Sequence, residues 1–484
     1  MSKPRRALTS PSRRCATCTF AAILLLVLVL VLGLAVAAVP QYEIELSVDW
    51  NSGTFTGIAQ VTVENSAEEP IDEVIFRLFP NDNSLYGNAS IRVTDATLAG
   101  EPVELRTHAD PTVLPIALPM PLDAAQTASL VLRFEGIAGT SPLHANYDVT
   151  GYGILTKNPR SLVLTAFYPI LAVLDSNGWS LDPPCGIGDA LWSIASDYTL
   201  TLSAPDTLAP VSSGRHVSSQ RENGLAVHHF AADSARDFSL VLTLGYEEAE
   251  LQSGSKTLRT WFTPPSRAAA ERTLLTASAA LSMYESLIGP LPQDEIDFVE
   301  VPLHRAAGVE FSGLILIASA YTPRPFDTFY DIIVSHEMAH QWFYDAVGSN
   351  PAKHPWLDEG LATYLSNVFL EAARGEEIAG AEVRRWQDAY AASQTTHPDL
   401  AISDPACGFP ESSIYSTFVY SAAAWFHHSV RHEIGEDAFF DALSGYYFAN
   451  VGRIGTPEEL IAAFQDACTC DLSDLFHAFG LAPE

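Results

Sequence analysis

Two short motifs contain the residues with the clearest capacity for chemistry. The motif HEMAH places His336 and His340 four residues apart, and on a helix this spacing of about 400° lets both imidazoles reach one metal ion. The motif WLDEG adds the carboxylate of Glu359 after eighteen intervening residues. Two imidazoles and one carboxylate form a zinc ligand set that leaves a coordination position for water, and Glu337 beside them suits a general base. The predicted chemistry is zinc-assisted hydrolysis.

Helical periodicity predicts the elements that position these groups. Thr328 and Asp331 form an S/T-x-x-D/E helix-start signal. The stripe predicted to face inward from this helix consists of Phe329, Ile332, Ile333, His336, His340, Phe343 and Val347. A second amphipathic helix, with Asp358 as its cap, is expected to begin around Glu359. If it runs antiparallel to the first helix, it returns the carboxylate to the two histidines.

The spacing of these motifs resembles that of the gluzincin family of zinc aminopeptidases, typified by aminopeptidase N and leukotriene hydrolase. Residues 308–315, GVEFSGLI, resemble the G-x-M-E-N-x-G-L exopeptidase motif of that family. Tyr415 and Tyr420 match its two tyrosines five residues apart. The resemblance covers nearly all of residues 41–484. It implies a short form of the family without the large C-terminal helical domain that usually closes the cavity.

The resemblance also implies a role for each site residue. One zinc ion per chain is expected, and its implied ligands are His336, His340 and Glu359. Glu337 would act as general base, and Tyr420 would donate a hydrogen bond to the oxyanion. Glu310 would pair with the free α-ammonium group of a peptide substrate, and the backbone at Gly308 would line the same edge. Tyr415 is the alternative to Tyr420.

Departures from the family pattern leave other functions open. Val309 and Phe311 stand where methionine and asparagine are usual, and residues 167–169 are apolar where the family's β domain lends a glutamine to the amine site. The chain also ends soon after its catalytic region. One alternative is a zinc endopeptidase or other hydrolase with an open site. Another is a non-catalytic binding protein on the same fold.

Sequence periodicity predicts a multidomain α+β protein. Alternating apolar and polar residues from Tyr42 to Trp50 indicate a half-buried strand, and similar strand patterns recur up to residue 244. We therefore expect an antiparallel β sandwich or saddle domain at residues 41–247. The remaining residues, 248–484, are expected to form a mostly helical domain, and the resemblance implies that it is a thermolysin-like catalytic domain.

The N-terminal region has the composition of a targeting segment. Residues 1–19 are basic, and residues 20–39 form an uncharged apolar run about as long as a transmembrane helix. The run is either a single-pass membrane anchor or a cleaved signal peptide. The basic flank favours an N-terminus inside the cell, which would place everything after Pro40 outside the cytoplasm.

The net charge and the cysteines indicate which binding partners and which cellular compartment to expect. The net charge of −32 is unfavourable for binding nucleic acid, which is not expected as a partner. The expected partners are a peptide substrate at the predicted zinc site and a membrane contacted through the N-terminal apolar helix. No oligomeric state is predicted. The cysteines expected outside the cytoplasm are Cys185, Cys407, Cys468 and Cys470, which allow three disulfide pairings.

Overall fold

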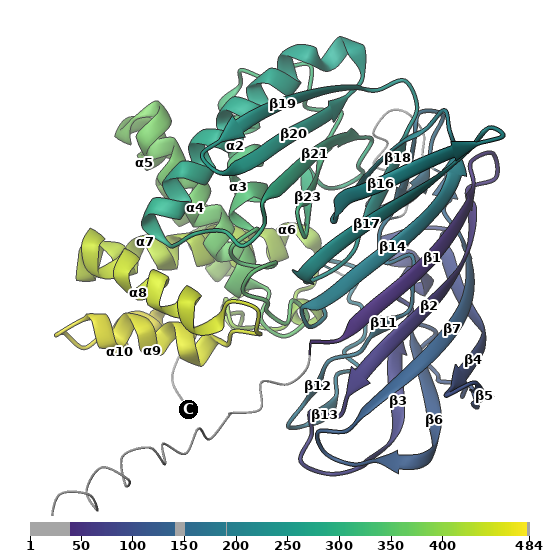
Figure 1. The fold of residues 1–484 in the computed structure, drawn as a ribbon. Coiled ribbons are helices and arrows are strands. Elements are labelled where there is room, and N and C mark those ends of the chain that lie inside the picture. Colours follow the sequence, from purple (N-terminus) through teal and green to yellow (C-terminus); the bar gives the residue numbers. More distant parts are fainter. Residues whose placement is uncertain (1–38, 141–150, 190, 482–484) are drawn as a thin grey trace, which may run out of the picture. The chain divides into compact units, whose positions relative to one another are not determined.

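A computed structural model describes residues 39–140, 151–189 and 191–481 of the chain. A strand-rich N-terminal region precedes a mostly helical C-terminal region, which confirms the predicted α+β class (Figure 1). The predicted segments 1–19 and 20–39 lie outside the described residues, apart from Val39. Within the described ranges, no helix has both the length and the apolar character needed to cross a membrane.

The N-terminal domain is built around a large twisted sheet. Its strand order is β16-β17-β14-β1-β2-β7-β4-β5. The bounds of these strands, in chain order, are β1 (Gln41–Asp49), β2 (Thr54–Glu64), β4 (Ser90–Leu98), β5 (Glu101–Pro102), β7 (Thr127–Ile137), β14 (Ser196–Pro205), β16 (Arg215–Glu222) and β17 (Leu225–Ala235). In β1 every second residue is buried, as the alternation predicted. However, β1 pairs in parallel with β14, so the prediction of a wholly antiparallel domain was wrong at this position. The long crossover between the two strands allows the parallel pairing.

Shorter sheets complete this domain. One has the order β15-β18-β10-β9-β8, another β11-β3-β6, and the third is the pair β12-β13. Their bounds are β3 (Ile71–Arg77), β6 (Val113–Leu122), β8 (Gly139–Thr140), β9 (Leu155–Lys157), β10 (Ser161–Leu164), β11 (Ile170–Leu171), β12 (Leu174–Asp175), β13 (Gly178–Trp179), β15 (Ala209–Ser212) and β18 (Leu240–Thr243). Two single-turn helices, η1 (Phe79–Asn81) and α1 (Asn83–Tyr86), follow β3. A buried aromatic group that includes Tyr42, Tyr168 and Tyr198 lies in the core between the sheets.

The C-terminal domain begins with a mixed sheet and continues with helices. The sheet order is β19-β20-β21-β23-β22, with β19 (Glu247–Ser253), β20 (Lys256–Phe262), β21 (Glu295–Val301), β22 (Gly308–Phe311) and β23 (Leu314–Ala318). The helical elements are η2 (Pro264–Ser266), α2 (Arg267–Leu287), α3 (Thr328–Ala339), α4 (Trp356–Arg374), α5 (Glu376–Thr396), η3 (Ala406–Gly408), α6 (Ser412–Tyr415), η4 (Ser416–Ala422), α7 (Ala423–Ile434), α8 (Glu436–Asn450), α9 (Pro457–Ala467) and α10 (Ser473–Ala478).

The capping of α3 differs from the sequence prediction. The helix begins at Thr328, as the start signal predicted, but its N-cap residue is Asp327, whose side chain makes no capping hydrogen bond, so the capping role assigned to Thr328 and Asp331 was wrong. The fully buried Asp331 carboxylate instead accepts hydrogen bonds from Arg272 of α2, at 2.7 and 2.6 Å, and from Arg374 of α4, at 2.9 Å. Two oppositely charged neighbours are a stronger attraction for a buried carboxylate than a helix cap. Asp331 thereby joins three helices beside HEMAH.

Helix α4 also begins differently from the prediction. Its N-cap is Pro355, and Asp358 lies inside the first turn rather than at the cap. The Asp358 carboxylate accepts hydrogen bonds from Ser349 Oγ at 2.7 Å and from the backbone N–H of Glu359 at 2.8 Å. A carboxylate in the first turn satisfies free backbone N–H groups there without being the cap.

A buried arginine connects the β domain to the helical domain. Arg236, in the segment after β17, donates hydrogen bonds to the backbone carbonyls of Tyr344 at 3.2 Å and Asp345 at 3.0 Å. The neighbouring Asp237 accepts hydrogen bonds from Ser312 N at 3.1 Å and from Tyr344 Oη at 2.9 Å. Buried charged groups must be hydrogen-bonded to be tolerated, so these bonds fix the segments after β22 and α3 relative to the β domain.

Replacing Asp331 with Asn tests the buried network. We expect the free energy of unfolding to fall by roughly 3 kcal/mol. This value is at the low end of the cost of breaking a buried ion pair, because the side chains of both arginines are partly exposed. Denaturant unfolding followed by tryptophan fluorescence measures this change. Glu135→Gln, which removes an exposed ion pair with Arg92, is the matched control and should cost at most about 1 kcal/mol. Equal effects of the two substitutions would contradict this role for Asp331.

Acid should weaken the same network. Burial alone raises the pKa of Asp331, but hydrogen bonds from Arg272 and Arg374 outweigh burial and hold this pKa below its ordinary value. The stabilisation is therefore complete above the unfolded-state pKa of about 3.9 and is lost as the pH falls through the lower folded-state value. The difference in stability between the wild type and Asp331→Asn should shrink in that acidic range.

Candidate active site

Helices α3 and α4 bring the three predicted ligand residues together in the interior. His336 Nε2 lies 3.1 Å from His340 Nε2 and 3.1 Å from Glu359 Oε2. His340 Nε2 lies 3.4 Å from the same carboxylate oxygen. His340 is the C-cap of α3, so the helix ends directly after it has placed both imidazoles, and Phe343 and Val347 lie beyond the helix. The predicted helical stripe was therefore too long, although its two histidines converge as expected.

The geometry of these atoms fits a zinc ion. Ligand atoms at ~2.0–2.1 Å from a tetrahedral zinc lie ~3.3–3.4 Å apart, close to the separations found here. His340 Nδ1 lies 3.0 Å from the carbonyl oxygen of Phe343, and because a carbonyl only accepts, Nδ1 holds the proton and Nε2 keeps its lone pair. Burial lowers the pKa of His336, which favours the neutral imidazole that a metal needs.

Glu337 lies beside the ligand group and faces Gly308. Its carboxylate is buried, and Oε2 has no hydrogen-bond partner among the described residues. Burial raises the pKa of Glu337 to about 8, although a positive charge on His340, if it were protonated, would oppose this shift. A Cβ atom at Gly308 would lie 2.4 Å from Glu337 Oε1 and 2.5 Å from Cδ. Because Gly308 has no side chain, the Glu337 carboxylate can occupy this space.

Tyr420 reaches the ligand group from a π-helical turn. The turn is η4, and widened turns of this kind often occur at functional sites because they redirect a side chain. The hydroxyl of Tyr420 donates a hydrogen bond to Glu359 Oε1. Burial, followed by the negative charge of Glu359, raises the pKa of Tyr420, so the phenol keeps its proton for donation. Tyr415 lines the same pocket, but its buried hydroxyl has no hydrogen-bond partner within the described ranges.

Strand β22 carries Glu310 into the pocket. A glutamine that the sequence analysis did not single out, Gln341, holds the end of this strand to α3. Its Nε2 donates to the carbonyl of Phe311 at 3.2 Å, and its Oε1 accepts from Gly313 N at 2.9 Å. Burial raises the pKa of Glu310, and the charge of Glu337 adds to this effect while His340 opposes it. A buried carboxylate with like charges nearby favours a cationic partner.

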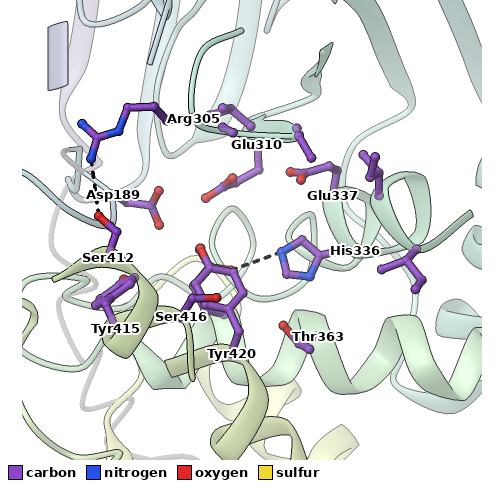
Figure 2. A pocket seen from close by; sticks show the side chains of 18 of the residues that line it. Asp189, Arg305, Glu310, His336, Glu337, Thr363, Ser412, Tyr415, Ser416 and Tyr420 are labelled. Carbon is purple, nitrogen blue, oxygen red and sulfur yellow. Dashed lines mark hydrogen bonds and ion pairs between the residues drawn. The ribbon is translucent and has the colours of Figure 1, made fainter. Parts of the chain in front are cut away.

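The pocket has a volume of about 430 Å³, and its walls come from both domains. Figure 2 shows His336 and Glu337 on one side of Tyr420 and Asp189 and Tyr415 towards the other, with the Glu310 carboxylate between Glu337 and Asp189. Asp189 belongs to a β-domain loop that sequence reasoning did not connect with the site. The available signal was the segment CGIGD, an acidic residue in a glycine-rich stretch beside Cys185.

Two disulfides select one of the three possible cysteine pairings. Cys185 bonds to Cys407 across 222 residues of sequence, and Cys468 bonds to Cys470. The first bond links the loop that precedes Asp189 to the helical domain.

Comparisons with known proteins agree with this arrangement. Residues 273–479 match the peptidase family M1 domain. Aminopeptidase M1-A from Oryza sativa subsp. japonica is 22% identical over 460 residues, which cover 91% of this chain and 49% of that protein. Aminopeptidase M1-C from the same organism is 24% identical over 348 residues, covering 69% of this chain and 36% of its own length. The chain thus spans about half the length, or less, of these curated relatives.

Solved structures share the fold. An M1 zinc metallopeptidase from Deinococcus radiodurans matches with a TM-score of 0.64 at 19% identity, covering 92% of this chain and 93% of that one. A mutant of a Deinococcus radiodurans M1 zinc metallopeptidase, bound to a Tyr-Ser-Ala substrate, matches with the same TM-score at 20% identity and covers 92% and 94%. The comparisons confirm the resemblance to the gluzincin aminopeptidases predicted from the sequence, and the solved structures confirm the two-domain fold.

Substituting Gly308 with Ala tests the close approach to Glu337. The added methyl group must displace the Glu337 carboxylate, so we expect the turnover of a peptide substrate to fall at least ~100-fold, as for loss of a general base, while bound zinc is unchanged. Peptidase assays together with metal analysis by mass spectrometry measure both quantities. Gly445→Ala, where an added Cβ meets open space in α8, is the matched control. Equal activity of the two variants would contradict the proposed packing.

Proposed function

We propose that this chain, whose residues 273–479 match the peptidase family M1 domain, is a zinc-dependent aminopeptidase that removes N-terminal residues from peptides. The observation that carries the proposal is the convergence of His336 Nε2, His340 Nε2 and Glu359 Oε2 to within 3.4 Å at the wall of a pocket that His336, Glu359 and Glu310 line. One zinc ion bound by these three residues would polarise the scissile carbonyl and lower the pKa of the attacking water.

Three side chains would transfer the proton, stabilise the developing charge and orient the peptide. Glu337 would accept a proton from the attacking water and deliver it to the leaving amine. The Tyr420 hydroxyl would donate a hydrogen bond to the carbonyl oxygen as negative charge develops on it. Glu310 would pair with the free α-ammonium group and set the position of the peptide in the pocket.

The charges in the pocket favour an aminopeptidase over the alternative endopeptidase. Glu310 is a buried carboxylate that lines the cavity near the predicted zinc ligands. The backbone of a peptide bound in mid-chain would bring no cation to it, and a buried carboxylate without a cationic partner is unfavourable. A free N-terminus supplies a positive charge. The Tyr-Ser-Ala peptide bound to the Deinococcus radiodurans mutant is a short peptide of the kind that this proposal requires.

A peptide panel with free and N-acetylated termini tests the proposal. We expect zinc-loaded protein to release single N-terminal residues from the free peptides and to leave the acetylated peptides intact, as mass spectrometry of the products would detect. Glu337→Gln should lower kcat by roughly 100- to 10,000-fold with unchanged zinc content. Mid-chain cleavage, or equal cleavage of acetylated peptides, would favour the endopeptidase. Absence of turnover by the zinc-loaded wild type would instead favour the non-catalytic binding protein.

We also propose that the catalytic domain works outside the cytoplasm, either anchored by residues 20–39 or released after cleavage. Support comes from the two disulfides, because such bonds persist in oxidising compartments. Protein isolated from its native compartment and alkylated in denaturant without reduction should carry no alkyl group on Cys185, Cys407, Cys468 or Cys470. Complete alkylation of these four cysteines, detected by peptide mass spectrometry, would contradict this location.

A further inference from the structure

The strongest feature that the proposed chemistry leaves unused is the Asp189 carboxylate. It lines the pocket, and its Oδ2 atom is buried without a hydrogen-bond partner among the described residues. Figure 2 shows its carboxylate directed into the space beside Glu310 and Tyr420. Burial, and then the negative charges of Glu310 and Glu359, raises the pKa of Asp189 well above its ordinary value. A carboxylate in these surroundings lacks a cation.

The loop that carries Asp189 is fastened to the helical domain at two earlier points. Asp182 accepts a hydrogen bond from Asn350 Nδ2 at 3.0 Å and lies 3.6 Å from Lys353 Nζ. The disulfide joins Cys185 to Cys407 with a Cα–Cα distance of 4.9 Å. These attachments hold the loop on the catalytic side of the molecule and restrict where Asp189 can lie.

Close packing continues to the residue before Asp189. Gly188 has φ +74° and rests against Tyr415, since a Cβ atom there would lie 2.4 Å from the tyrosine hydroxyl oxygen. Only glycine adopts this conformation so close to a neighbour without strain. The contact with Tyr415 therefore holds the loop against the pocket wall. The backbone that carries Asp189 is restrained by it.

The arrangement of the pocket indicates which part of a substrate would meet Asp189. With the α-ammonium group at Glu310 and the scissile carbonyl between Glu337 and Tyr420, the N-terminal side chain must extend into the remaining space. Asp189 and Tyr415 lie on that side of Tyr420, away from His336 (Figure 2). The cavity of about 430 Å³ is within the range that accommodates small ligands and leaves room for a long side chain.

We propose that Asp189 is a specificity-determining residue that selects peptides whose N-terminal side chain is cationic, namely arginine or lysine. This inference rests on the proposed aminopeptidase function and adds its substrate class. The N-terminus of such a peptide carries two positive charges, so the α-ammonium pairs with Glu310 and the side-chain cation pairs with Asp189. The net charge of −32 also favours the approach of cationic peptides.

A basic residue at the mouth of the pocket does not satisfy Asp189. Arg305 is exposed, and its guanidinium donates to Ser412 Oγ at 3.4 Å and lies 5.6 Å from the centroid of the Tyr152 ring. Figure 2 shows this guanidinium directed towards Ser412 at the edge of the view. If Arg305 instead determined specificity, the preferred N-terminal side chain would be acidic, and the experiment below separates the two outcomes.

The test compares two fluorogenic substrates that differ only in charge, one with N-terminal arginine and one with N-terminal citrulline. For the zinc-loaded wild type, kcat/KM should be roughly 30-fold or more higher for arginine, the effect of a buried, hydrogen-bonded charge pair. Asp189→Asn should bring the arginine-to-citrulline ratio close to one. Asp175→Asn, which changes an exposed carboxylate at the end of β12, is the matched control and should keep the wild-type ratio.

Each outcome has a distinct meaning. Equal use of arginine and citrulline by the wild type overturns the inference but leaves the aminopeptidase proposal intact, and this result needs no variant to fold. Parallel losses on both substrates in Asp189→Asn also overturn it, because the carboxylate would then serve the α-ammonium alone. Faster cleavage of N-terminal glutamate than glutamine would assign specificity to Arg305. No cleavage of any free N-terminus would overturn the proposed function, and the inference with it.

Discussion

The candidate site depends on one constraint: three atoms that could bind a metal ion, carried by α3, its C-cap residue His340 and α4, must lie within 3.4 Å of one another in the protein interior. Without a cation, such a concentration of buried polar groups is unfavourable. Packing around α3 and α4 therefore has to hold these groups in place before metal arrives. Asp331, buried beside HEMAH and bonded to arginines of α2 and α4, supplies part of that rigidity.

Both domains build the substrate end of the pocket. Gln341 follows directly after His340 and fixes the end of β22, so the strand that carries Glu310 is held by the same segment that ends the ligand helix. Arg236 and Asp237 of the β domain bind the residues just beyond these two elements. The disulfide between Cys185 and Cys407 attaches a β-domain loop to the helical domain. Contacts between the two domains therefore set the distance between the predicted zinc ligands and Glu310.

Local periodicity explains how much of this could be predicted from the sequence. Helical spacing was enough to bring His336 and His340 together, and alternation was enough for β1, because both patterns depend on neighbouring residues. The partners of Asp331, the π-helical turn at Tyr420 and the pairing of Cys185 depend on residues distant in sequence, so no local pattern reveals them. Asp189 was missed for the same reason, since Glu310 and Tyr420, which line the same pocket, are more than a hundred residues away along the chain.

The most direct test of the central claim is to locate the metal by anomalous X-ray scattering at the zinc absorption edge, using crystals of the wild-type protein. The structure contains two groups of residues, among those described, that could hold a metal ion: His336 with His340 and Glu359, and His340 with Glu310 and Glu337. Our account predicts one peak per chain within the first group, which leaves Glu337 and Glu310 free for proton transfer and substrate binding. A peak in the second group, or none in either, would contradict it.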